Sequence, residues 1–105
     1  MKIRHKFGAR RTTILGRSYS SKLEAGYSKR LTHYKEKGEL LFWLEQVPFR
    51  LPGNIVYRLD FMEFWSNQDI ILTEVKGLET ETWKIKHKLF LETYPWLEIN
   101  LVRKL

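Results

Sequence analysis

The sequence predicts a mixed α/β (α+β) domain in which a sheet of about four strands is flanked by two helices, in the order α-β-β-β-α-β. Three observations predict this class. A chain of 105 residues has room for one modest core. Its composition, 43% hydrophobic and 14% aromatic, is that of a folded protein. The spacing of apolar residues changes along the chain from helical to strand-like and back.

The chain divides near residue 20. Residues 1–19 show no sustained hydrophobic period and carry several glycines, threonines and serines, so they are interpreted as an arm with room for a short extended stretch. Residues 20–105 hold the periodic segments and are interpreted as the folded domain.

The first helix is expected to begin at Ser20 or Ser21, either of which can cap it, and to stop near Gly38. Apolar residues recur at helical spacing between these points: Leu23, Tyr27, Leu31 and Tyr34. Gly26 lies inside this helix and costs about 1 kcal/mol relative to alanine. We therefore expect another part of the chain to approach the backbone closely there.

Three strand-like runs follow the first helix. The run 40–51 ends in a Pro-Gly-Asn turn, and the run 55–65 follows it, which predicts an antiparallel hairpin. A second turn at 66–69 leads to a short strand at 70–76. A helix over 80–94 and a closing strand over 96–102 complete a β-α-β crossover, so the sheet is expected to be mixed.

The net charge of +7 lies at one end of the chain. Seven basic residues precede Glu24, which is the first acidic one: Lys2, Arg4, Lys6, Arg10, Arg11, Arg17 and Lys22. The other twelve of the 19 basic residues balance the twelve acidic ones. A basic arm on a neutral body favours a polyanionic partner such as nucleic acid; the alternative is a solvated tail that keeps the protein soluble.

The composition also excludes some classes of protein. There is no cysteine, which excludes disulfides and thiolate metal sites. No apolar run approaches the ~20 residues of a membrane span, so no membrane partner is expected. The N-terminal residues lack the apolar stretch of a signal peptide, and a cytoplasmic location is expected.

Three polar residues on the second and third strands carry the strongest chemical signal. Glu74 and Lys76 share one face of a strand while Val75 points to the other face. Antiparallel pairing through the four-residue turn can bring Asp60 beside Glu74. Two carboxylates at that separation repel each other unless one is protonated or a cation lies between them. Carboxylate oxygens suit a hard ion, Mg²⁺ or Mn²⁺ in its place, rather than zinc.

The carbonyl of Val75 could add an oxygen ligand, and Glu24 on the first helix could complete the set. An ion so held can polarise a phosphate and lower the pKa of a bound water. The ammonium of Lys76 would stabilise the attacking hydroxide or the pentacovalent phosphate. From Glu74 and Lys76 alone, a structural ion pair is as good an interpretation as catalysis.

This arrangement resembles the PD-(D/E)XK nuclease superfamily: Asp60, a hairpin turn, then Glu74-x-Lys76, with Glu24 on a preceding helix. More narrowly, several segments look like a family of small phage and prophage proteins of this type, with a core similar to Holliday-junction resolvases; they are 6–12, 21–25, 46–49, 57–61, 74–77 and 84–90. Leu59 stands where the superfamily pattern has proline. No Gln-x-x-x-Tyr signature follows in the second helix, which argues against the RecB-like branch.

The resemblance implies a restriction-endonuclease-like core and Mg²⁺-dependent hydrolysis of DNA phosphodiester bonds. Asp60 and Glu74 would bind the metal, Glu24 would be a further ligand directly or through water, and Lys76 would be the electrostatic catalyst. A branched DNA or junction would be one expected substrate, in the host cytoplasm if the protein is phage-encoded. So small a domain covers little DNA, which favours a homodimer for cutting two strands.

Contacts with DNA are expected from seven residues: Lys6, Arg10, Arg11, Lys22, Gln46, Lys84 and Lys88. Lys84 and Lys88 are one helical turn apart and could hold a phosphate, or could equally form a solvated face. The four tryptophans are expected in the core and the three histidines on the surface. Two rival functions remain: a non-catalytic DNA-binding or accessory protein that keeps the fold, and an RNA-binding module, for which no signature is present.

Overall fold

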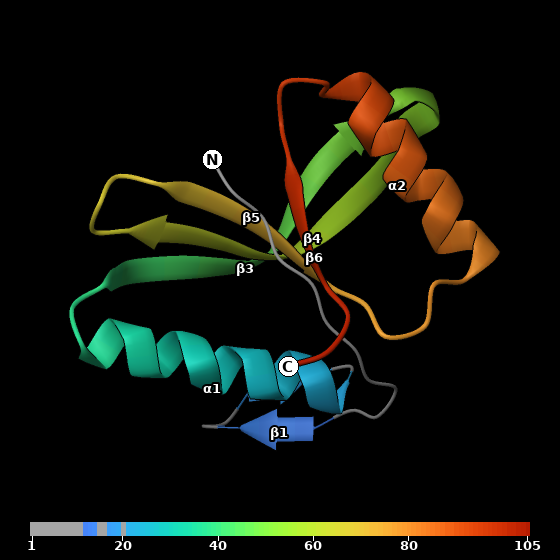
Figure 1. Ribbon diagram of the computed structural model, residues 1–105. Coiled ribbons are helices and arrows are strands. Elements are labelled where there is room, and N and C mark those ends of the chain that lie inside the picture. The colour runs from blue at the N-terminus through green and yellow to red at the C-terminus, as the bar shows by residue number, and fades with distance from the viewer. Residues whose placement is uncertain (1–11, 15–16, 20) are drawn as a thin grey trace.

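The computed structural model describes residues 12–14, 17–19 and 21–105. Its core has two helices and a mixed four-stranded sheet in the order α-β-β-β-α-β, which confirms the predicted fold class (Figure 1). The elements are β1 (Thr12–Ile14), β2 (Arg17–Tyr19), α1 (Lys22–Glu36), β3 (Leu40–Leu51), β4 (Ile55–Trp65), β5 (Ile70–Val75), α2 (Glu81–Thr93) and β6 (Ile99–Val102).

The sheet has the strand order β3-β4-β5-β6. The pairs β3–β4 and β4–β5 are antiparallel hairpins, and β5–β6 is the parallel pair that the crossover through α2 predicts. A short 3₁₀ turn, Pro52–Asn54, joins β3 to β4, with Gly53 at φ 77°. Among the described residues no helix is long and apolar enough to span a membrane.

Helix α1 begins where the sequence predicts. The Ser21 hydroxyl caps it by accepting a hydrogen bond of 3.0 Å from the backbone N–H of Glu24. A Cβ added to Gly26 would lie 2.6 Å from Cδ1 of Leu105, so the C-terminal residue closely approaches the helix at this point. The close approach expected at Gly26 is therefore confirmed.

Two apolar clusters hold the two helices against different parts of the sheet. The first joins α1 to the sheet through Ala25, Tyr27, Leu31, Leu40, Phe61, Val75 and Val102. The second joins α2 to the sheet through Leu51, Tyr57, Leu59, Leu72 and Phe90. In Figure 1 the long β3–β4 hairpin runs from the part of the sheet beside α1 to the part beside α2. Leu59 and Phe61 belong to different clusters, so Asp60 between them lies at the junction of the two.

A polar network centred on Glu63 is buried beneath α1. Glu63, 1% exposed, accepts hydrogen bonds from Tyr27 Oη at 2.5 Å and Thr73 Oγ1 at 2.6 Å. The indole N–H of Trp65 donates to the other carboxylate oxygen of Glu63, Oε1, at 3.0 Å. Asn100 Nδ2 donates to Thr73 Oγ1 at 3.0 Å. Three donors on one carboxylate offset much of the cost of burying it. No single segment of the sequence indicates this network.

Within the arm, residues 12–14 and 17–19 form a small two-stranded antiparallel sheet, in line with the short extended stretch expected there. Other sequence expectations need correction. The last strand begins at Ile99 rather than at Trp96, and Trp96 is not in the core but 72% exposed, because the chain turns at Pro95 before the strand starts. His87 is not a surface residue: it is half-buried, and its ring stacks on that of Trp83 with the ring centroids 4.6 Å apart.

Candidate functional site

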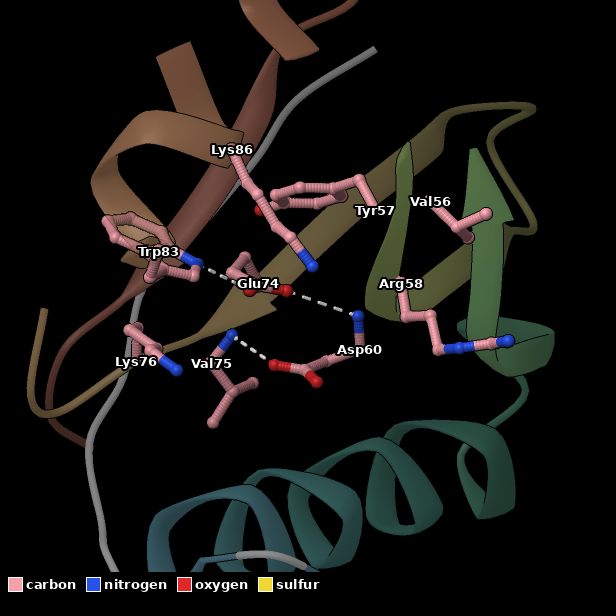
Figure 2. Close-up of a pocket in the computed structure, with 9 residues that line it drawn as sticks. All are labelled: Val56, Tyr57, Arg58, Asp60, Glu74, Val75, Lys76, Trp83 and Lys86. Carbon is pink, nitrogen blue, oxygen red and sulfur yellow. Dashed lines mark hydrogen bonds between the residues drawn. The ribbon is translucent and has the colours of Figure 1, made fainter. Parts of the chain in front are cut away.

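Asp60 and Glu74 are joined where the regular pairing of β4 and β5 ends. The last Cα partners are Phe61 and Thr73, and Asp60 and Glu74 come next on each strand. The backbone N–H of Asp60 donates to Glu74 Oε1 at 3.3 Å, and the backbone N–H of Val75 donates to Asp60 Oδ2 at 2.8 Å (Figure 2). Each carboxylate thus accepts a backbone N–H from the opposite strand. The structure confirms that the hairpin brings the two carboxylates together.

Glu74 is held from the other side by helix α2. The carboxylate is 5% exposed, and its Oε2 accepts a hydrogen bond of 2.9 Å from the indole N–H of Trp83. Both oxygens of Glu74 therefore accept an N–H donor, one from β4 and one from α2. A carboxylate fixed in this way keeps one orientation in the pocket.

Asp60 is held by the edge strand as well as by β5. Gln46 Nε2 on β3 donates to Asp60 Oδ1 at 3.0 Å. The backbone of Gln46 has φ 53°, in the left-handed region that residues other than glycine, asparagine and aspartate seldom adopt. Such strain tends to occur at functional positions. Gln46, predicted as a DNA contact, is thus in contact with one of the predicted metal ligands.

Lys76 follows directly after β5 and lines the same pocket as the two carboxylates. Its backbone N–H donates to the carbonyl of Val102 at 3.0 Å, which fixes the chain at the end of the parallel pair. The ammonium lies 6.0 Å from the centre of the Trp83 ring. Within the described part of the chain Lys76 makes no ion pair, so its charge faces the pocket rather than a structural partner.

Glu24 lies outside this pocket lining. It is in the first turn of α1, 4% exposed, and its neighbour Ala25 packs in the same cluster as Val75. The first turn of α1 is therefore close to the end of β5. Across residues 21–105, however, no three carboxylate or imidazole side chains form a group that could hold a metal ion. A direct ligand set of Glu24, Asp60 and Glu74 is not formed in this structure.

The pocket has a volume of about 300 Å³. Its lining also includes five residues that were not predicted as site residues from the sequence: Val56, Tyr57, Arg58, Trp83 and Lys86. The Trp83–Lys86 spacing of three residues places both on one helix face. The buried hydroxyl of Tyr57 makes no hydrogen bond within the described residues. Burial raises the pKa of Tyr57 far above its ordinary value of 10.0, and the charges of Glu74 and Asp60 raise it further.

The other predicted DNA contacts lie elsewhere. Lys84 is exposed and forms an ion pair with Glu81 at 3.5 Å, and neither Lys84 nor Lys88 lines the pocket. Lys22 is exposed in the first turn of α1. Lys6, Arg10 and Arg11 lie outside the described residues.

The donor set fits a hard divalent cation. Asp60 and Glu74 offer carboxylate oxygens, and the carbonyl of Val75 belongs to the same pocket-lining strand. A carboxylate oxygen has more than one lone pair, so an oxygen that accepts an N–H can also ligate a metal. Mg²⁺ is usually bound through one or two carboxylates, with water and substrate phosphate completing the octahedron. Two carboxylates are sufficient for that chemistry.

Comparison with known proteins identifies one family. The family model that matches residues 4–105 has the description "Protein of unknown function (DUF1064)". No curated protein and no solved structure matches the chain.

Proposed function

The chain belongs to the DUF1064 family, and we propose that it is a metal-dependent DNA endonuclease of the PD-(D/E)XK type. One observation carries the proposal. The carboxylates of Asp60 and Glu74 each accept a backbone N–H from the opposite strand where the pairing of β4 and β5 ends, and Lys76 lines the pocket that they share. The order of helices and strands is the one that the superfamily resemblance implies.

Asp60 and Glu74 would hold Mg²⁺, or Mn²⁺ in its place, with the carbonyl of Val75 as a further ligand. When bound, the ion supplies polarisation of the phosphate and a water of lowered pKa. Glu24, in the adjacent turn of α1, would act through water. Lys76 would stabilise negative charge that develops on the phosphate oxygens during attack.

The substrate we propose is DNA, of branched or junction form, cut in the cytoplasm of a host cell by a protein of phage or prophage type. The seven basic residues before Glu24 would contribute non-specific affinity for the phosphate backbone. A homodimer would allow two strands to be cut by one particle.

The test is cleavage of a panel of linear, flapped and branched DNAs with Mg²⁺ or Mn²⁺. The wild type should cut at least one of them, while Asp60→Ala and Lys76→Ala should cut it at least about 100-fold more slowly. If both variants cut as fast as the wild type, the proposal is wrong.

One observation favours a second candidate, a non-catalytic DNA-binding or accessory protein. All four oxygens of Asp60 and Glu74 accept N–H donors, which is also what two purely structural carboxylates would do. This candidate predicts salt-sensitive DNA binding that is unchanged by divalent metal or by Glu74→Gln.

A further inference from the structure

Lys86 is a pocket cation that comes from a helix rather than from the strands. Helix α2 buries Trp83 against Glu74, and Lys86 is one turn further along, so its side chain reaches over the pocket (Figure 2). In Figure 2 the ammonium of Lys86 points toward the space between Glu74 and Asp60. Lys84 and Lys88, on either side of it in sequence, are exposed and outside the lining.

The charges around this pocket favour an anion. Among the described lining residues, Arg58, Lys76 and Lys86 face two carboxylates, which leaves one positive charge in excess. A divalent ion on Asp60 and Glu74 would add two more. Lys86 is half-buried and, within residues 21–105, has no ion-pair partner. A partly desolvated ammonium is stabilised by an anionic ligand.

We propose that Lys86 binds a backbone phosphate of the DNA, and so holds the strand against the carboxylate pair. A lysine binds phosphate as a compact point charge without demanding one geometry. A pocket of about 300 Å³ has room for a phosphodiester and part of its sugar. This inference rests on the proposed function only in taking DNA as the ligand, and it requires no cleavage.

The test is binding of a short labelled DNA duplex in EDTA, measured by fluorescence anisotropy at several salt concentrations. Lys86→Met keeps the aliphatic stem and removes the charge. Lys29→Met, at an exposed position of α1 outside the pocket lining, is the control that removes the same charge elsewhere. Lys86→Met should weaken binding about tenfold and lower the slope of log affinity against log salt concentration by about one. Lys29→Met should change both less, and Lys86→Arg should restore most of the affinity.

Equal affinities and salt slopes for Lys86→Met and Lys29→Met would overturn the inference. Inorganic phosphate, added as a competitor, distinguishes a nucleic-acid site from a site for the free ion. The inference predicts that millimolar phosphate does not displace the duplex, and displacement at micromolar phosphate would contradict it. If no DNA is cut in any metal while Lys86→Met still loses binding, the nuclease proposal fails and the phosphate contact stands.

Discussion

The indole N–H of Trp83 donates to Glu74 Oε2 at 2.9 Å, which couples the first turn of α2 to the carboxylate at the end of β5. A partner of this kind orients a metal-binding carboxylate without touching the metal. Helix α2 thereby contributes to the site twice, through Trp83 beneath Glu74 and through Lys86 over the pocket.

Replacing Trp83 with phenylalanine should weaken metal binding. The change removes the indole N–H and keeps an aromatic ring, so Glu74 loses one of the N–H donors that orient it. We expect the affinity for Mn²⁺, measured by calorimetry, to fall about tenfold or more. Trp96→Phe is the control, since Trp96 is 72% exposed and outside the pocket. Equal Mn²⁺ affinities in the two variants would show that the Trp83 bond does not serve a metal site.

His87 should make the protein less stable as the pH falls. Burial lowers its pKa from the ordinary 6.5 and Arg103 lowers it further, against an opposing effect of Glu79. Its buried Nδ1 makes no hydrogen bond within the described residues. Below about pH 6.5 the unfolded chain takes up a proton that the folded chain does not, so stability is full above that pH and decreases below it.

The measurement is urea unfolding at steps between pH 7.5 and pH 5. The variant His87→Phe keeps a ring beside Trp83. It should remove the contribution of His87 to the slope of the unfolding free energy against pH, which is at most about 1.4 kcal/mol per pH unit. His33→Gln, at an exposed position of α1, should leave the profile of the wild type unchanged. A His87→Phe profile parallel to that of the wild type would contradict this assignment.

Two glycines should respond to alanine in opposite directions. Among the described residues, the methyl added at Gly26 meets only the tip of the Leu105 side chain, which is 51% exposed and can rotate away. Gly26→Ala should therefore stabilise α1 by up to about 1 kcal/mol. Gly38 has φ 79°, so Gly38→Ala should destabilise by about 1 kcal/mol. The free energy of unfolding of each variant, measured by chemical denaturation, checks both predictions. A clear loss of stability in Gly26→Ala would contradict the first, because it would mean that the Leu105 side chain cannot move away from the added methyl.

The sequence was sufficient to predict most of the fold and the centre of the site. Residue alternation and the four-residue turn predict that Asp60 and Glu74 are opposite each other, because local pairing rules determine both. The start of α1 was predictable from another local signal, the capping by Ser21.

The rest depends on tertiary packing that no local pattern encodes. Lys84 and Lys88 share a helical turn, but the face of α2 turned to the pocket is set by the burial of Trp83, and that face presents Lys86 instead. The buried Glu63 network likewise joins α1, β4 and β5, so no single segment indicates it. The exposed position of Trp96 follows from the turn that precedes β6.

The most direct test of the metal-dependent nuclease is the cleavage rate of Asp60→Asn. This change keeps the size of the side chain and removes the charge that the metal requires. Asp69→Asn, in the β4–β5 turn away from the pocket, is the matched control. With a cleavable DNA and Mg²⁺, we expect Asp60→Asn to be at least about 100-fold slower than Asp69→Asn, and we expect EDTA to abolish cleavage by both. Equal rates for the two variants, or cleavage that persists in EDTA, would contradict it.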